Sequence, residues 1–315
     1  MKCKYKFKII GKIKPSHIYP IMARGATYEF EVNESGVATY IVVTIKTDDE
    51  RYWPNISKSS TPGVAFHLNI SENPLIFFVR MELRIIEGLL SLYGVHSIGL
   101  NYPQIEWIPE NEEEKEKMKI FNFKTGTTEL SDNEIIPTPF DIIARSIIGA
   151  DKGYDVEVAL SFYRKGRIDV EEKRYIEAIY NFYFLLESTY GNGKFKKRQI
   201  STEFKNSTIL IESIQSVQND PRTRILSNPK LKQEYENKYK NKSPENIIDQ
   251  IIELRGFLHH HTSKRKGIWH PENQDKYKLD ALFIQLISFN VAFRLSEICV
   301  FDEEVTRTYE KQFFR

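Results

Sequence analysis

The first nine residues alternate strictly between apolar and polar side chains. Lysine occupies every second position from 2 to 8, and the positions between and beyond hold apolar residues, Cys3, Tyr5, Phe7 and Ile9. A period of two is typical of a strand with one buried face, and exposed lysines oppose edge-to-edge pairing. Similar β-rich stretches recur at 26–32, 38–45 and 63–70, separated by turn sequences such as NESG and STPG. This part of the chain is predicted to form a sheet.

Residues 73–94 are apolar and long enough for a helix, although their Ile, Phe and Val content is also compatible with strands. Residues 1–108 are therefore predicted to form a β-rich domain, a sandwich or small barrel with at least one helix. Residues 109–139 contain the charge run PENEEEKEKMK and a turn-rich stretch that ends in two prolines. Because this composition buries little core, we expect a linker there.

The pattern becomes helical in residues 140–315. A helix is predicted over 169–193, beginning with acidic residues and ending at glycine, and a second one over about 204–217, followed by a loop at 219–230. Ser243 and Pro244 have the residue types of an N-cap and a first helical position. Residues 275–301 are apolar on nearly all sides, which indicates a central or interface helix. The predicted fold class is α+β multidomain, with an all-α bundle as its second domain.

Composition narrows the function only slightly. The chain has 315 residues, of which 41% are apolar and 13% aromatic, and this favours two ordered globular domains. Its net charge of +2 means that a polyanion would have to be recognised by a local basic patch. Cys3 and Cys299 have no spacing typical of a disulfide framework or a thiolate metal site. With no signal peptide and no uninterrupted apolar run of membrane-spanning length, we expect a cytoplasmic protein without membrane attachment.

The most unusual segment is LRGFLHHHTSKRKGIWH, residues 254–270, which holds four of the seven histidines. It covers the end of the helix that begins at Ser243 and a cationic turn before the last apolar helix. The dipole at a helix C-terminus favours protonated histidine, which suits groups that exchange protons near neutral pH. The segment is therefore the leading candidate for a chemical site.

The segment resembles the signature of the HEPN family, an arginine followed after four to six residues by a histidine. Arg255 and His260 are separated by four residues, and Arg255 and His261 by five. The resemblance covers roughly 154–301, and the aromatic stretch 182–194 is similar to the first long helix of bacterial HEPN proteins. The chain departs from the family at Gly256, where the family often has a polar residue.

This resemblance implies a homodimer of helical bundles that forms a metal-independent endoribonuclease site at its interface. The ribose 2′-hydroxyl would attack the adjacent phosphodiester and leave a 2′,3′-cyclic phosphate, so DNA would not be cleaved. His260 would act as general base or acid, and Arg255 would stabilise the phosphorane. No cofactor is implied.

Other residues receive secondary roles. On helix geometry alone His259 is the better partner, because it lies four residues from Arg255 on the same face, but the family spacing favours His260. His259 and His261 are candidate helpers, and Glu187 is a candidate for orienting Arg255. Two basic clusters are candidates for binding RNA phosphates: Lys264, Arg265 and Lys266, and Lys194, Lys196, Lys197 and Arg198. The histidines and the basic clusters are also compatible with solvated helix ends, and Glu187 is also compatible with a partly exposed surface acid.

Three alternative functions are compatible with the sequence to different degrees. A zinc site is disfavoured because adjacent helical side chains diverge by about 100°, and no metal is predicted. A non-catalytic HEPN module for dimerisation or ligand binding is the main alternative, whereas a DNA-binding regulator lacks a helix-turn-helix pattern. In the nuclease interpretation, the β-rich domain senses a protein or small-molecule trigger or restrains the nuclease, as in HEPN proteins of phage defence and toxins.

Overall fold

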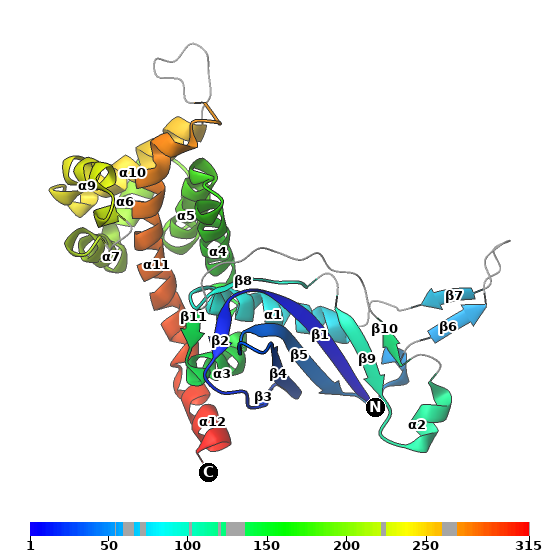
Figure 1. The fold of residues 1–315 in the computed structure, drawn as a ribbon. Coiled ribbons are helices and arrows are strands. Elements are labelled where there is room, and N and C mark those ends of the chain that lie inside the picture. The colour runs from blue at the N-terminus through cyan, green and yellow to red at the C-terminus, as the bar shows by residue number, and fades with distance from the viewer. Residues whose placement is uncertain are drawn as a thin grey trace. The chain divides into compact units, whose positions relative to one another are not determined.

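The computed structural model has an α+β fold in which an antiparallel sheet precedes a series of helices (Figure 1). It describes residues 1–53, 55–58, 66–69, 74–100, 103–118, 121–123, 136–221, 225–259 and 270–314. Contacts divide the chain into two compact units. Unit 1 comprises residues 1–154 and 299–315, and unit 2 comprises residues 155–298.

Unit 1 is built on one open sheet with the strand order β10-β9-β1-β5-β4-β3, and β8 also pairs with β1. The pairs along this sheet are antiparallel. Its strands are β1 Lys2–Gly11, β3 Ile21–Ala23, β4 Ala26–Val32, β5 Ala38–Lys46, β8 Val95–Ile98, β9 Gln104–Ile108 and β10 Asn122–Phe123. Two further pairs are β2 Ile13–Pro15 with β11 Ile136–Thr138, and β6 Asn55–Lys58 with β7 Phe66–Asn69.

The predicted alternation of β1 is confirmed, since the side chains of Cys3, Tyr5, Phe7 and Ile9 are buried. The prediction of a sandwich or small barrel is wrong for the described strands, which form an open sheet. The reason is that a helix takes the place of a second sheet. The helix α1, Pro74–Ser91, packs on β8, and its buried Glu82 accepts a hydrogen bond from the Tyr28 hydroxyl on β4.

Unit 1 also contains α2 Glu112–Lys117, α3 Phe140–Ile148, α12 Glu303–Phe313 and the 3-10 turns at Glu50–Tyr52 and Gly149–Gly153. α2 has no buried residue, in keeping with the low core content expected of this region. The boundaries of the two units differ from the domain boundaries that the sequence predicted at residues 108 and 139. β10 and β11 bring parts of the expected linker into sheets, and α3 packs on α1 and α12 inside unit 1.

Arg24 connects three elements of unit 1. Its guanidinium pairs with the Glu82 carboxylate, with one Nη2–Oε2 distance of 2.9 Å, and donates to the carbonyl oxygens of Ile147 and Ile148 at 2.8 Å each. Glu82 is only 1% exposed. The Glu82 carboxylate is therefore buried, and it accepts hydrogen bonds from both Arg24 and Tyr28, as a stable buried ion pair requires.

Unit 2 is helical in its described residues. Its helices are α4 Glu157–Glu171, α5 Tyr175–Tyr190, α6 Lys197–Asn206, α7 Thr208–Asn219, α9 Pro229–Tyr235, α10 Pro244–His259 and most of α11 Lys278–Val300, with a π-helical turn at Glu236–Lys240 and a 3-10 turn at Gln274–Tyr277. α4 and α5 form a close pair, in which a Cβ at Gly166 would clash with the Phe182 ring at 2.5 Å. The buried Asp280 of α11 accepts hydrogen bonds from Lys238 and Tyr239, and Tyr239 stacks on Phe283.

The helix predicted over 169–193 is wrong at its beginning. Asp169 lies in the last turn of α4, which stops in a Schellman motif: Lys173 N donates to Val170 O and Arg174 N to Asp169 O. Lys173 adopts the left-handed conformation with φ 61°, a position where glycine is usual. The second predicted helix is likewise two helices, because Ser207 ends α6 and caps α7 by accepting from Leu210 N.

The predicted start of α10 is confirmed, since Ser243 accepts from Asn246 N and Pro244 is the first helical residue. α11 is buried on most sides, as expected for a central helix. Residues 274–300 are also long and apolar enough to cross a membrane: an 18-residue window within them has a mean hydropathy of 1.4, although half of that window is buried inside the protein. The sequence predicted no uninterrupted apolar run of this length, and polar residues do interrupt the helix, but they are too few to bring its mean hydropathy below that of membrane spans.

Candidate functional site

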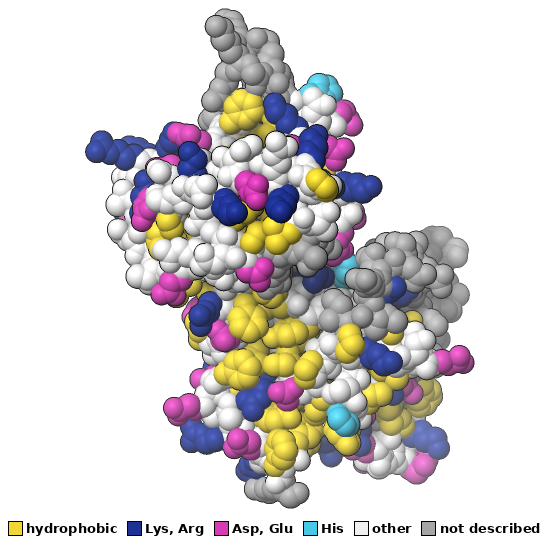
Figure 2. All heavy atoms as spheres, turned by 60° about the vertical axis from the view of Figure 1, so that its left-hand side comes forward, with side chains coloured by type: hydrophobic (Ala, Val, Ile, Leu, Met, Phe, Trp, Pro, Cys, Tyr) yellow, Lys and Arg dark blue, Asp and Glu magenta, His cyan; other side chains and the backbone are white. Residues whose placement is uncertain are grey.

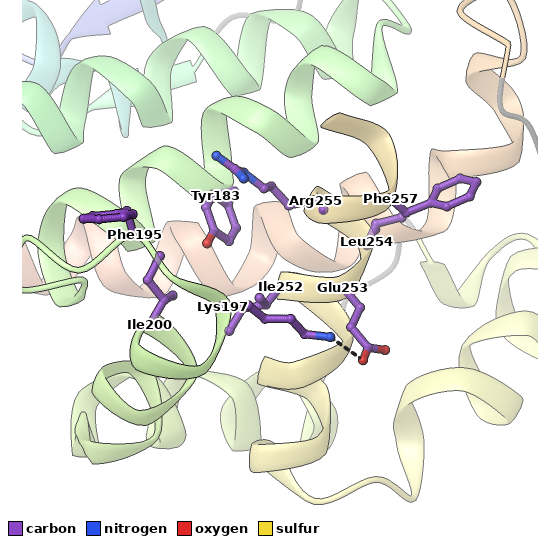
Figure 3. A pocket seen from close by; sticks show the side chains of 10 residues that line it. Tyr183, Phe195, Lys197, Ile200, Ile252, Glu253, Leu254, Arg255 and Phe257 are labelled. Carbon is purple, nitrogen blue, oxygen red and sulfur yellow. Dashed lines mark hydrogen bonds and ion pairs between the residues drawn. The ribbon is translucent and has the colours of Figure 1, made fainter. Parts of the chain in front are cut away.

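An open pocket of about 700 Å³ lies in unit 2 between α5, α6 and α10 (Figure 3). α5 contributes Tyr183, the loop before α6 contributes Phe195, α6 contributes Lys197 and Ile200, and α10 contributes residues 252–257. The pocket therefore contains Arg255, the arginine that the sequence selects. Its size falls within the range usual for small-molecule sites.

Polar contacts fix α6 against α10 beside this pocket. Asp249 accepts from Lys205 Nζ and from Ser201 Oγ, both at 2.7 Å, and Lys197 Nζ pairs with Glu253 at 2.9 Å (Figure 3). Burial raises the pKa of Asp249, but the contacts with Lys205 and Ser201 outweigh burial and hold this pKa below its usual value. The carboxylate is thus stabilised in its charged form, and it holds the two helices together.

Arg255 extends from α10 over the ring of Tyr183, with its guanidinium carbon 5.2 Å from the ring centroid (Figure 3). Its Nε–H is buried and has no hydrogen-bond partner among the described residues. Burial raises the pKa of Tyr183 to about 12; the charge of Glu187 adds to this rise and that of Arg255 opposes it. The arginine is therefore positioned by an aromatic face and not by a hydrogen bond or ion pair with a described residue.

Glu187 does not hold Arg255 directly in the structure. No ion pair or hydrogen bond joins these two side chains, and the charges of both act on Tyr183 instead. Glu187 lies one turn after Tyr183 on α5 and is partly buried. The arrangement gives Tyr183 the positioning role for which the sequence suggested Glu187.

The basic cluster 194–198 covers the end of the connection between α5 and α6 and the first two residues of α6. Asn192 and Gly193 both have positive φ, and Lys194 N donates to Gly191 O at 2.8 Å, so the chain turns tightly before α6. Lys194, Lys196, Lys197 and Arg198 are all exposed, and Lys197 is the one paired with Glu253. This places exposed cations at the edge of the pocket that contains Arg255.

Gly256 follows Arg255 on α10 and also lines the pocket. A Cβ at this position would meet no described heavy atom within 4 Å. Glycine inside a helix is less favourable than alanine, and packing here does not require it. The missing side chain leaves open space beside the arginine.

The other predicted site residues divide into two groups. His259 is the last residue of α10 and is exposed. His260, His261, Lys264, Arg265 and Lys266 lie outside the described residues. No group of three or more His, Cys, Asp or Glu suited to a metal occurs in the part of the chain that the structure describes.

Reasoning from the sequence missed Phe195, which lines the pocket with an exposed fraction of 78%. A signal was present in the stretch GKFKKR, where one aromatic residue lies among four cations. Such interleaving is typical of nucleic-acid binding surfaces. Figure 2 shows positive and negative side chains interspersed on the face in view, whereas residues 194–198 contain four cations and no acid.

Comparisons of the chain with models of known protein families, with curated proteins and with solved structures find no match.

Proposed function

We propose that the protein is a metal-independent endoribonuclease of HEPN type that acts as a homodimer in phage defence or as a toxin. The observation that carries the proposal is the state of Arg255. It lies in an open pocket, its buried Nε–H has no described partner, and its guanidinium contacts an aromatic ring. Residues 254–271 contain no Asp or Glu, and they include the cations Lys264, Arg265 and Lys266 in addition to Arg255.

The chemistry follows from these residue types. His260 removes the proton from a ribose 2′-hydroxyl or returns one to the leaving oxygen, and Arg255 stabilises the negative charge that develops on the phosphorus centre. A permanently charged, fork-shaped guanidinium suits this role because it can donate two hydrogen bonds to phosphate oxygens. The reaction needs no cofactor, and its RNA substrates would be cytoplasmic.

Unit 1 would then sense a trigger or restrain the nuclease. It exposes several large apolar side chains, including Ile18, Tyr19, Met22, Phe301 and Phe314, and Figure 2 shows hydrophobic side chains gathered on one of its faces. Exposed apolar groups of this kind are common at surfaces that bind other proteins. This supports a regulatory role for unit 1 without identifying the trigger.

The second candidate is a non-catalytic module for dimerisation or ligand binding. One observation favours it: no described histidine or carboxylate forms a hydrogen bond with Arg255. In this case the pocket would bind a ligand and cleave nothing.

Cleavage of RNA in the presence of EDTA separates the two candidates. We expect the full-length protein to cut labelled single-stranded RNA to products with a 2′,3′-cyclic phosphate, and Arg255→Ala and His260→Ala each to reduce the rate by at least about 100-fold. Arg294→Ala and His17→Ala are matched controls, since both wild-type side chains are exposed and outside the pocket.

Sedimentation and thermal unfolding should show that all four variants remain folded dimers. A wild-type protein that cleaves no RNA, and that is not toxic on expression, would favour the non-catalytic module. A monomeric wild-type protein would contradict the shared site.

A further inference from the structure

Phe195 is the most exposed large hydrophobic side chain in the described part of the chain, at 78%. Its backbone is nevertheless fixed on both sides. The turn at Asn192 and Gly193 precedes it, and Lys196 is the N-cap of α6 immediately after it. An aromatic ring presented to solvent by a constrained backbone loses little conformational freedom when a ligand covers it.

The ring of Phe195 borders the same pocket as Arg255. Figure 3 shows Phe195 on the α6 side, the guanidinium of Arg255 reaching toward it from α10, and Tyr183 between them, while Phe257 points away. An apolar plane and a guanidinium that forms no ion pair with a described residue thus border one cavity of about 700 Å³. A planar ring and an anionic group in one ligand would satisfy both walls.

The charges around Phe195 favour an anion. Lys194, Lys196 and Arg198 are exposed, and none of them forms an ion pair with a described residue. Residues 188–202 contain no Asp or Glu. Glu253, the one acid that lines the pocket, is neutralised by Lys197 at 2.9 Å. An approaching phosphate therefore meets attractive charges.

We propose that this pocket binds one nucleotide of single-stranded RNA, with its base stacked on Phe195 and an adjacent phosphate at Arg255. The assignment of RNA rests on the proposed function, whereas the stacking role of Phe195 rests on the pocket itself. Stacking on an isolated aromatic ring requires a base whose face is free, so a single strand fits and a continuous duplex does not. Lys194, Lys196 and Arg198 hold the neighbouring phosphates without reading the sequence.

Gly256 has a defined place in this proposal. It lines the pocket next to Arg255, and a Cβ there would meet nothing within 4 Å. The open space admits the sugar and phosphate beside the helix backbone. A large side chain at position 256 should therefore obstruct the ligand while leaving the protein folded.

Fluorescence anisotropy with a labelled 2′-O-methyl oligonucleotide tests the proposal on the full-length protein. This probe lacks the attacking hydroxyl, so binding is measured without cleavage. We expect Phe195→Ala to weaken binding by about 5- to 100-fold, Phe195→Trp to retain it, and Gly256→Leu to weaken it while the unfolding temperature is maintained. Phe314→Ala is the matched control, because Phe314 is 73% exposed and belongs to unit 1.

Two further probes, duplex RNA and adenosine monophosphate, test whether the pocket binds a nucleotide within a single strand more tightly than one within a duplex or a free nucleotide. Weak binding of both relative to the single strand supports the proposal, whereas stronger binding of the monophosphate than of the strand overturns it in favour of a nucleotide signal. Equal affinity of Phe195→Ala and wild type also overturns it, as does a wild type that binds no single strand.

These results are separable from the nuclease test. If Phe195→Ala loses binding but the wild type cleaves no RNA, the pocket stands and the proposed nuclease falls. If Arg255→Ala and His260→Ala lose cleavage while Phe195→Ala binds normally, only the stacking site falls.

Discussion

Two arginines, one in each unit, show how differently this fold treats the same side chain. Arg24 of unit 1 pairs with Glu82 and donates to two backbone carbonyls of α3. Arg255 of unit 2 has a buried Nε–H without a described partner, and its guanidinium lies over the face of Tyr183. Leaving a donor unused costs stability, whereas a fully paired donor locks neighbouring elements together. The first arrangement suits a structural role and the second a ligand-binding role.

The largest expected effect comes from removing the partner of Arg24. Glu82→Ala leaves a guanidinium that is 19% exposed with Asp151, at 3.7 Å, in place of its closer counter-charge, and it leaves the buried Tyr28 hydroxyl without its acceptor. We expect a loss of about 3–5 kcal/mol in the free energy of unfolding of unit 1. Urea unfolding followed by the fluorescence of Trp107, which is buried in unit 1, measures the loss.

Urea unfolding of Arg255→Ala gives the corresponding free energy for the second arginine and so tests the contrast between the two. Because the guanidinium of Arg255 forms a cation–π contact and no ion pair with a described residue, its removal should change the free energy of unfolding by no more than about 1 kcal/mol, as followed by helical circular dichroism. Glu82→Gln should fall between wild type and Glu82→Ala, and Glu34→Ala, which removes an exposed acid, should have little effect. Similar losses for Arg255→Ala and Glu82→Ala would remove the distinction on which the functional assignment depends.

Asp280 tests whether unit 2 also satisfies its buried charges. It is 4% exposed and accepts from Lys238 Nζ at 2.5 Å and from the Tyr239 hydroxyl. Asp280→Asn should destabilise unit 2 by about 2–4 kcal/mol, since the amide cannot replace a charged acceptor shared by two donors. Thermal unfolding of this variant beside Glu234→Gln, an exposed acid, measures the effect. A neutral Asp280→Asn would show that Lys238 and Tyr239 do not need a charged acceptor.

Lys173 offers a smaller change in the opposite direction. Its φ of 61° is unfavourable for a residue with a Cβ, and its side chain is exposed. Lys173→Gly should therefore stabilise unit 2 by about 1 kcal/mol. Lys165→Gly, the same change at an exposed position inside α4, should destabilise it by about the same amount. Both shifts can be read from thermal unfolding, and equal signs would contradict the assigned Schellman motif.

Lys173 also shows why the sequence predicted some elements better than others. The strand of residues 2–11 and the helix that begins at Pro244 are encoded by local patterns, an alternation and a cap, and both are confirmed. The break between α4 and α5 depends on a lysine in a conformation that usually requires glycine, so no residue type marks it. Likewise, the open sheet depends on α1 packing across strands that are distant in sequence, which no local pattern specifies.

The residues of the candidate site likewise differ in whether a local sequence pattern selects them. Arg255 was found because its spacing from histidine is a linear motif, and the cations of 194–198 because they are consecutive. Their location at one pocket depends on the packing of α6 against α10, two helices that are separated in the sequence by residues 207–243. Tyr183 and Phe195 acquire their relation to Arg255 only through that packing. The sequence therefore predicted the charged groups and missed the aromatic walls.

The smallest predicted effect concerns the contacts that hold those walls in place. The pKa of Asp249 lies below its usual value because its contacts with Lys205 and Ser201 outweigh the effect of burial. A group whose pKa is lower in the folded state stabilises the protein above its unfolded pKa, about 3.9, and this contribution is lost as pH falls through the folded pKa. Wild type should therefore be more stable than Asp249→Asn at pH 7, by less than about 1 kcal/mol because the pair is partly exposed. Urea unfolding from pH 7 to pH 3 should show the difference shrinking below about pH 4, whereas a difference that grows with acidity would show that Asp249 does not join α6 to α10 through its charge.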